Sequence, residues 1–438
     1  MWGQTTEPMP SRRLFFRKAA GMAGFLSIAG LSTYGAAKDI SGALNELHIS
    51  SPEESIQNDE LWKRIQQAYT ISPNIINLNN GGVSPQPKVV QDAVDRYYHL
   101  SNEAPSYYMW QILDKGRESV RMKLADLAGC SKEEIAINRN TTEALDNAIF
   151  GISLRKGDEV ILTKQDYPNM INAWKQREMR DGIKLIWVNL DLPTENEDSI
   201  IDAYTAATTS RTKVYHITHM INWNGQILPV ARLCAEAGKR NITTIVDGAH
   251  TFAHIDYNIN ELGCDYFGTS LHKWLCAPFG TGMLYVRKEK IAETWPLLSS
   301  PDPKSDDIRK FESLGTRSFA PEQAIGHAVN FHNAIGSKLK EDRLRYLKNY
   351  WCDQVKEHPR ISLGTPAGSN YSCALAIVDL QGMEPIQLYH RLFKEYAIHT
   401  SPIVWENIKG VRITPHVYTL KKDLDRLATA LLTMADEK

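Results

Sequence analysis

From residue 134 onward, short β-branched runs alternate with amphipathic helical stretches, and this alternation limits the possible folds more than any other feature. The apolar runs lie at 135–137, 159–162, 184–188, 213–217, 243–246 and 266–268, with helical patterns at 142–152, 168–179 and 230–240. Strands joined by helical crossovers run parallel, and helices cover both faces of such a sheet. We therefore expect an α/β domain with a largely parallel sheet, whose ligands bind at the carboxyl ends of the strands.

The flanking segments predict a second, smaller domain. Helical patterns occur at 61–68, 87–100 and 115–128, and the loop 77–85 is rich in Asn and Gly. A hairpin or edge strand at 283–286 would close the sheet, and a long helical region follows over 321–351. Strands at 371–379 and 411–414, with helices at 384–396 and 422–434, predict an α+β domain. The expected organisation is an export signal (1–37), an amino-terminal segment with a substrate loop (38–85), a large cofactor-binding domain (86–330) and a small carboxyl-terminal domain (331–438).

The first 37 residues have the pattern of an export signal. Arg12 and Arg13 precede two Phe residues and a Gly- and Ala-rich apolar stretch, and no acidic residue lies between Ser11 and Asp39. The paired arginines resemble a twin-arginine signal, which the Tat export machinery reads. We expect a cut near Ala37 and a periplasmic or exported protein. An uncleaved membrane anchor is less consistent with the many glycines and serines, and no later stretch approaches a membrane span, so no membrane attachment is expected after signal removal.

Charge and cysteine content exclude several other classes of protein. Lys and Arg total 50 against 51 Asp and Glu, and no basic block appears beyond the first twenty residues, so nucleic acid is not an expected partner. The six cysteines contain no CxxC pair, which argues against a zinc ribbon or a disulfide scaffold. They are expected to be small buried apolar residues.

Two residues at predicted strand ends indicate a particular cofactor. Asp247 ends the strand at 243–246 and is followed by Gly248, which permits close approach of a ligand. Lys273 follows the strand at 266–268 among apolar neighbours, where a lowered pKa would let its amine form a Schiff base. Pyridoxal 5′-phosphate needs such a lysine for its aldehyde and a carboxylate for its pyridine nitrogen. Either residue alone is more often a turn former or a surface charge, but together they favour this cofactor.

Eight short stretches in a fixed order carry a family resemblance. They are Leu78-Asn79-Asn80-Gly81-Gly82, Asn140-Thr141-Thr142-Glu143-Ala144, Asp166-Tyr167-Pro168, Asn222-Trp223-Asn224-Gly225, Asp247-Gly248-Ala249-His250, Ser270-Leu271-His272-Lys273, Gly315-Thr316-Arg317 and Val411-Arg412-Ile413-Thr414-Pro415-His416. From about residue 75 to 425 the chain resembles the class V aminotransferase family of fold-type I pyridoxal phosphate enzymes, and most closely its isopenicillin-N-epimerase-like branch. The resemblance implies a fold-type I large domain and a smaller carboxyl-terminal domain.

The resemblance also implies how the cofactor would be held. Lys273 would bind its aldehyde, and Asp247 would pair with its pyridine nitrogen. Tyr167 would stack on the ring. The phosphate would bind at a helix N-terminus, and two further residues would contact the phenolic oxygen. Four residues would hold the phosphate: Thr141, Thr142, Ser270 and His272. Asn222 and His250 would contact the phenolic oxygen.

Three other positions concern the substrate and the partner subunit. Arg412 matches the arginine that binds the substrate α-carboxylate, a role suited to its planar fork of donors. Asn79 and Asn80 would lie near the substrate. Thr316 matches a residue that the family lends to the phosphate of a partner subunit, which implies a homodimer.

Three alternatives compete with this interpretation. Cysteine desulfurases need a nucleophilic cysteine shortly before the carboxylate-binding arginine, but none lies between Cys373 and Arg412. His250 also stands where those enzymes carry Gln, so desulfuration is disfavoured. A metal site could be drawn from His216 with His219, or from His250 with His254 and Asp247. A catalytically silent binding protein with the same fold is the third alternative.

The expected function is therefore that of an exported, dimeric pyridoxal phosphate enzyme. It would act at the α-carbon of a small-molecule amino acid, or of a residue with a free α-amino group. Epimerisation, transamination, β-elimination and decarboxylation all remain open at this point, because one fold supports each of them. The principal alternative is a pyridoxal phosphate lyase or decarboxylase that tailors a secreted peptide such as a siderophore precursor.

Overall fold

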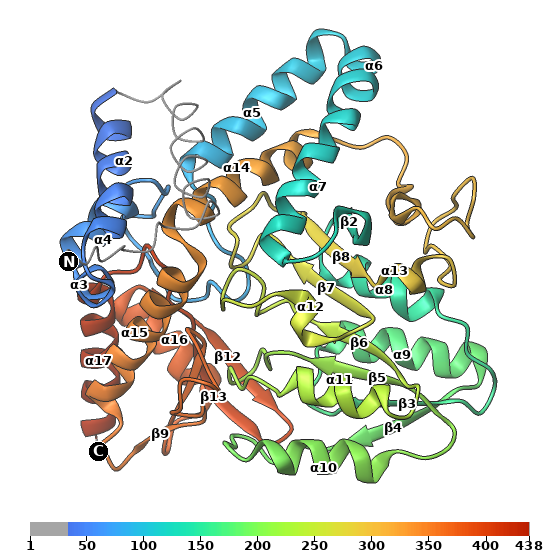
Figure 1. Ribbon diagram of the computed structural model, residues 1–438. Coiled ribbons are helices and arrows are strands. Elements are labelled where there is room, and N and C mark those ends of the chain that lie inside the picture. Colours follow the sequence, from blue (N-terminus) through green and yellow to red (C-terminus); the bar gives the residue numbers. More distant parts are fainter. Residues whose placement is uncertain (1–33, 438) are drawn as a thin grey trace, which may run out of the picture.

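A seven-stranded sheet forms the centre of the larger part of the molecule (Figure 1). The computed structural model describes residues 34–437, and within them the strand order of this sheet is β2-β8-β7-β6-β5-β3-β4. The strands are β2 (Ile135–Asn138), β3 (Glu159–Thr163), β4 (Lys184–Val188), β5 (Thr212–Thr218), β6 (Thr243–Asp247), β7 (Tyr266–Ser270) and β8 (Gly282–Val286). The pairs that β8 makes with β2 and β7 are antiparallel, while all pairs from β7 to β4 are parallel. The prediction of a largely parallel sheet is confirmed, and β8 forms a hairpin with β7 but lies inside the sheet rather than at its edge.

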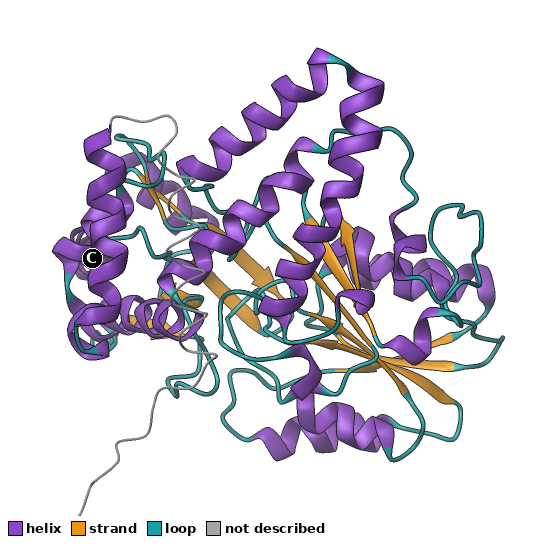
Figure 2. Cartoon of the chain, turned by 45° about the horizontal axis from the view of Figure 1, so that its top comes forward, coloured by secondary structure: helices purple, strands orange, loops and turns teal. Residues whose placement is uncertain are grey.

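Helices cover both faces of this sheet, because the side chains of its inner strands are apolar on both sides. Ile245 on β6 packs toward the face that carries α8 and α9, whereas the next residue, Val246, packs toward the opposite face. Figure 2 shows the strands fanned between the two helical layers. The first layer contains α8 (Thr141–Gly151), α9 (Pro168–Asp181) and α13 (Lys288–Ile291); the second contains α5 (Lys88–Glu103), α7 (Asp114–Ala128), α10 (Glu197–Ala207), α11 (Val230–Gly238), α12 (Ile259–Leu262) and α14 (Ala320–Ile335).

A four-stranded antiparallel sheet organises the carboxyl-terminal part, and it confirms the predicted smaller α+β unit. Its order is β12-β13-β10-β9. The strands are β9 (Ile361–Leu363), β10 (Ala376–Leu380), β12 (Ser401–Trp405) and β13 (Ile408–Ile413), and the accompanying helices are α15 (Ser337–Val355), α16 (Pro385–Tyr396) and α17 (Lys421–Asp436). The hairpin of β12 and β13 brings this sheet toward the edge of the large one.

The amino-terminal segment lies against the carboxyl-terminal part (Figure 1). Helices α2 (Tyr34–Ile49), α3 (Pro52–Gln57) and α4 (Asp59–Gln66) lead to β1 (Ile76–Asn77), which pairs in parallel with β11 (Ile398–His399). This pairing fixes the start of the loop 77–85, which then runs toward the edge of the large sheet. The export signal predicted for residues 1–37 lies outside the described residues except for its last four positions.

Two further findings concern helices. The long helical region predicted over 321–351 is two helices, α14 and α15, because Gly336 between them has a φ of +93°, which a helix does not contain. Between α5 and α7 the chain forms a short helix, α6 (Pro105–Tyr107), and a π-helix over Tyr108–Leu113. None of the helices within residues 34–437 has the length and apolar character needed to cross a bilayer.

Candidate active site

A cavity of about 390 Å³ lies where the carboxyl ends of the large sheet face the small sheet. Ten of the thirteen residues proposed from the sequence line it: Thr141, Thr142, Tyr167, Asn222, Asp247, His250, Ser270, His272, Lys273 and Arg412. They come from segments as far apart in the chain as Thr141 and Arg412. Parallel strands deliver their carboxyl ends to one edge, and this explains why the large-domain residues meet there.

Asp247 and Lys273 form the charged centre of the cavity. Asp247 is the last residue of β6, and its Oδ1 accepts a hydrogen bond of 3.0 Å from the Ala249 N–H. Burial raises the pKa of Asp247, while that hydrogen bond and the Lys273 charge oppose the rise. Lys273 follows β7, and burial lowers its pKa to about 8 although Asp247 acts in the other direction. A lysine with this pKa supplies neutral amine near neutral pH, as a nucleophile requires.

His250 is the nearest polar neighbour of the Lys273 amine. Its Nε2 lies 3.2 Å from Lys273 Nζ. Burial, followed by the charges of Lys273 and Arg412, holds the pKa of His250 well below its ordinary value, so the ring is neutral. A neutral imidazole nitrogen can accept a hydrogen bond from the lysine ammonium, and its other ring nitrogen then remains available to a ligand.

The N-terminus of α8 supplies a polar cup beside these residues. Asn140 caps the helix by accepting a hydrogen bond from the Glu143 N–H at 2.9 Å. The Thr141 N–H donates to Ser270 Oγ at 2.9 Å, and the two hydroxyl oxygens lie 2.7 Å apart. A helix N-terminus with hydroxyls binds anions such as phosphate. Gly282 permits this arrangement, because a Cβ there would stand 2.5 Å from the Asn140 backbone nitrogen.

Arg412 faces the cavity from β13 of the small sheet. Its Nη1 donates to the Asn222 carbonyl oxygen at 2.8 Å and its Nη2 to Asn79 Oδ1 at 3.0 Å. The side chain forms no salt bridge within residues 34–437, and its Nε is buried without a hydrogen-bond partner. Burial lowers the pKa of Arg412 to about 10, so it remains cationic at neutral pH. A buried guanidinium without an acidic partner is suited to binding the carboxylate of a ligand.

Three proposed residues do not line this cavity. Asn79 lies behind Arg412, to which it is hydrogen-bonded. Asn80 is fully buried: its amide donates to the Thr414 carbonyl at 2.7 Å, and its Oδ1 accepts from the Tyr418 hydroxyl at 2.5 Å. Asn80 therefore holds the loop and does not face the substrate space. Thr316 is exposed, away from the cavity of its own chain, as a residue lent to a partner subunit would have to be.

The cavity also contains residues to which the sequence assigned no role. Thr218 ends β5 in register with Asp247, and its hydroxyl donates to Asp166 Oδ1 at 2.7 Å. The position of Thr218 at a strand end was a signal that could have identified it. Trp223 stacks on Trp405 with ring centroids 5.0 Å apart, a contact between the two domains that no local pattern reveals. Met170, Ser401 and Ile403 also line the cavity, as do four residues of the quoted motifs: Gly81, Gly82, Asn140 and Ala249.

The residues present fit pyridoxal phosphate as a ligand. Three buried polar atoms around the cavity have no hydrogen-bond partner within residues 34–437: Asn222 Oδ1, His250 Nδ1 and Arg412 Nε. Such atoms are costly unless a ligand or water satisfies them. A phosphate matches the α8 N-terminus, an aldehyde matches the Lys273 amine, and a protonated ring nitrogen matches the Asp247 carboxylate.

The geometry gives no support to the alternative sites. Within the described part of the chain, no group of three or more His, Cys, Asp or Glu side chains is arranged to hold a metal ion. His216 lies within β5 and His219 directly after it; both side chains are buried, and burial lowers their pKa values to about 3. The six cysteines all belong to the described residues, and none lines the cavity; Cys373 is fully buried.

Comparisons with known proteins agree with this site. A model of the aminotransferase class-V family matches residues 76–427. Isopenicillin N epimerase of Streptomyces clavuligerus is 29% identical over 400 residues, covering 86% of this chain and 99% of the relative. A probable cysteine desulfurase of Halalkalibacterium halodurans is 26% identical over 398 residues, covering 85% and 96%.

A solved structure of a C-DES variant, with glycine covalently linked to its PLP cofactor, has a TM-score of 0.74 to this chain. The two are 19% identical, and the match covers 84% of this chain and 97% of the other. This likeness confirms the fold-type I architecture that the sequence predicted. Because the family match spans most of the chain and its residues meet in one cavity, the protein belongs to the aminotransferase class-V family and is a pyridoxal phosphate-dependent enzyme.

Proposed function

We propose that this enzyme acts at the α-carbon of an amino acid, or of an amino-terminal residue, that carries a free α-amino group. The observation that carries the proposal is the presence of Lys273 and Arg412 in one cavity, without a salt bridge to either side chain in the described chain. The guanidinium matches the α-carboxylate of an amino acid, and the Lys273 amine would hold the cofactor aldehyde, with which the α-amino group of the substrate reacts. The relative named isopenicillin N epimerase, similar over nearly its whole length, supports a reaction at this carbon.

Each residue has a separate part in the proposed reaction. When bound, pyridoxal phosphate withdraws electrons from the α-carbon of an amino acid attached to it. Asp247 would stabilise a positive charge on the ring nitrogen, and Thr141 and Ser270 would hold the phosphate. Arg412 would fix the substrate carboxylate through charge-assisted hydrogen bonds. Lys273 Nζ, with a pKa of about 8, can take up or release a proton at the α-carbon, and neutral His250 can hydrogen-bond the amine in either state.

Hydrogen exchange at the α-carbon tests this proposal. The purified, cofactor-loaded enzyme is incubated with a panel of amino acids and amino-terminal peptides in heavy water, and mass spectrometry follows deuterium uptake and products. We expect uptake at the α-position that Lys273→Ala abolishes. Lys348→Met is a matched control, because Lys348 is also buried with a lowered pKa but donates to Ser372 Oγ outside the cavity. Full uptake in Lys273→Ala would overturn the role of this amine.

The products distinguish the alternatives. An inverted amino acid indicates epimerisation, and an amine released with carbon dioxide indicates decarboxylation. A keto acid formed without free ammonia indicates transamination, whereas a keto acid with ammonia and a lost β-substituent indicates β-elimination. The predicted export supports the alternative, in which the substrate is a siderophore precursor or another secreted peptide. Desulfuration is not part of the proposal, because no cysteine lines the cavity.

The proposal extends to location and assembly. Arg12 and Arg13 support recognition by the Tat machinery and a periplasmic or exported enzyme. Replacing both arginines by lysine should leave the protein in the cytoplasm, which cell fractionation would measure. Unaltered export of this variant would contradict the Tat assignment.

The exposed Thr316 supports a homodimer. Light scattering should give twice the monomer mass, whereas a monomer with full cofactor affinity would refute this assembly.

A further inference from the structure

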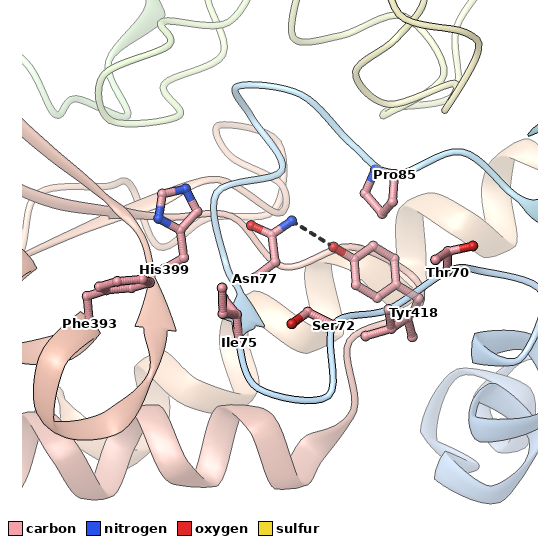
Figure 3. Close-up of a pocket in the computed structure, with 9 residues that line it drawn as sticks. Thr70, Ser72, Ile75, Asn77, Pro85, Phe393, His399 and Tyr418 are labelled. Carbon is pink, nitrogen blue, oxygen red and sulfur yellow. Dashed lines mark hydrogen bonds between the residues drawn. The ribbon is translucent and has the colours of Figure 1, made fainter.

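His399 on β11 lies outside the catalytic cavity that contains Lys273. Its half-buried ring lines a second cavity of about 400 Å³, and Figure 3 shows it there together with Asn77 and Phe393. Within residues 34–437, no residue lines both cavities. His399 nevertheless contacts the catalytic residues indirectly, because a single side chain, that of Asn79, joins it to Arg412.

The backbone fixes Asn79 between the strands that carry these two residues. On one side β1 pairs in parallel with β11, and the Leu78 N–H donates to the His399 carbonyl oxygen at 2.8 Å. On the other side the Asn79 backbone forms a parallel bridge to Thr414, directly after β13, the strand that carries Arg412. The Asn79 side chain is therefore held within reach of both His399 and Arg412.

The hydrogen bonds of the Asn79 amide have only one consistent assignment. Arg412 Nη2 lies 3.0 Å from Asn79 Oδ1, and a guanidinium only donates, so the amide oxygen must face Arg412. The amide nitrogen Nδ2 then faces His399, whose Nε2 lies 3.4 Å away. Because Nδ2 only donates, His399 Nε2 must accept. This arrangement requires a neutral His399 that carries its proton on Nδ1.

Protonation of His399 would reverse the Asn79 amide. A charged imidazole has an N–H at both nitrogens, so its Nε2 would face the Asn79 Nδ2 as donor against donor. Half a turn of the amide would give His399 an acceptor, but it would direct the NH₂ group at Arg412. The guanidinium would then lose its acceptor. At neutral pH this does not occur, because burial lowers the pKa of His399 and keeps the ring neutral.

Few titratable groups face the His399 ring. Tyr389 of α16 meets it edge-on with ring centroids 6.4 Å apart, and Tyr418 lines the same cavity. No Asp, Glu, Lys or Arg is among the described residues that line this cavity. The charged group that His399 reaches is Arg412, through Asn79. A change in the charge of His399 therefore acts on the Asn79 amide.

We propose that His399 is a positioning residue for substrate binding, which as a neutral acceptor holds the Asn79 amide in the orientation that Arg412 needs to bind a carboxylate. This inference rests on the proposed function, in which Arg412 binds the substrate carboxylate. Carboxylate binding should then weaken as the pH falls through the pKa of His399, which lies below its ordinary value of about 6.5. At neutral pH and above it should be constant.

Binding of alanine and ethylamine to the cofactor-loaded enzyme tests the inference. Ethylamine is alanine without its carboxylate, so the ratio of the two affinities measures what the carboxylate contributes and cancels the pH effects on the amine and on Lys273. The visible absorbance band of the bound cofactor reports each affinity between about pH 4.5 and pH 8, where the carboxylate stays ionised. We expect a constant ratio near pH 8 and a fall of about fivefold toward pH 4.5.

Two variants separate this role of His399 from a merely structural one. His399→Gln places a carboxamide oxygen near the position of Nε2, and this acceptor does not titrate, so the ratio should stay high at about pH 4.5. His399→Leu removes the acceptor, so the ratio should be about fivefold lower at every pH. His390→Gln is the matched control, because His390 is an exposed histidine on α16 that lines neither cavity. It should keep the wild-type profile.

Three results would overturn the inference: a wild-type ratio that does not change with pH, a fall in acid that persists in His399→Gln, or a wild-type ratio in His399→Leu at pH 8. If alanine still binds more tightly than ethylamine in those cases, the proposed function stands. Equal affinity for alanine and ethylamine at every pH would instead refute the binding of a carboxylate by Arg412, and the proposed function with it.

Discussion

The two walls of the catalytic cavity differ in how they are built. The large-sheet wall carries Asp247, Ser270 and Lys273 at or just after the ends of neighbouring strands, where the backbone ladder fixes each residue. The small-sheet wall carries Arg412, Ser401 and Ile403 on the β12–β13 hairpin, which reaches the cavity from another sheet. The first wall is therefore rigid in itself, while the position of the second depends on contacts between domains.

This difference separates chemistry from recognition. The large-sheet wall contains the groups that would hold the cofactor and move protons. The small-sheet wall contains Arg412, which would bind the substrate carboxylate. Interdomain contacts set its position: Trp405 stacks on Trp223, and Gln165 Nε2 donates to Asn407 Oδ1 at 3.1 Å. Changes to the first wall should affect kcat and cofactor affinity, whereas changes to the second should affect KM.

Of the substitutions that compare the two walls, Asp247→Asn is expected to have the largest effect. Asp247→Asn removes the buried anion that would pair with the ring nitrogen, and the loss of a buried charged partner costs about 4 kcal/mol, or roughly a thousandfold in kcat/KM. Steady-state kinetics should show the loss in kcat. Asp265→Asn is the control, since Asp265 is buried but binds the Thr244 N–H at the opposite end of the sheet. If Asp247→Asn changes KM and leaves kcat unaltered, the proposed division of roles between the two walls is wrong.

A smaller effect is expected at Arg412. Lysine cannot reproduce the planar donor pair of arginine, so Arg412→Lys should raise KM about a hundredfold and change kcat less. Initial rates over a range of substrate concentrations measure this. Arg232→Lys is the control, because Arg232 forms exposed ion pairs with Glu197 and Asp198 away from the cavity. This variant should change neither kcat nor KM. If kcat falls with KM unchanged, the small-sheet wall takes part in the chemistry.

Cofactor loading should depend on pH through Lys273. The pKa of this amine is lowered to about 8, so the reactive neutral form is dominant above pH 8 and falls with decreasing pH. The rate of reconstitution of the apoenzyme with pyridoxal phosphate should therefore fall about tenfold per pH unit below 8 and level off above it. Absorbance after rapid mixing measures the rate. A rate that rises toward acid would refute the assignment.

The smallest effect is expected at Asn79. Asn79→Ala removes the acceptor that holds Arg412 Nη2, and we expect KM to rise about fivefold while kcat stays within about twofold. Rescue by Asn79→Asp would show that an acceptor at this position is what Arg412 requires; no change in KM on mutation to alanine would show that Arg412 is held by Asn222 alone.

Local sequence patterns predicted most of the large-sheet wall. The strands at 243–247 and 266–270 are apolar runs that end in polar residues, so the sequence pattern alone places Asp247 and Lys273 at one sheet edge. The helix α10 (Glu197–Ala207) was not among the helical stretches named from the sequence, although Ile200, Ile201 and Tyr204 form its buried face. The edge position considered for β8 was wrong, because the strand that covers it, β2, lies about 150 positions earlier in the chain.

What the sequence by itself determined is the identity of the chemical groups and the strand ends that carry them, because the period of apolar residues and the turn residues are local properties. Only the tertiary structure decided that Asn80 is used internally while Asn79 contacts Arg412, and that Trp223 meets Trp405. Those relations join segments hundreds of residues apart. The packing of side chains between the two sheets determines these contacts, and no local sequence pattern contains the distances on which this packing depends.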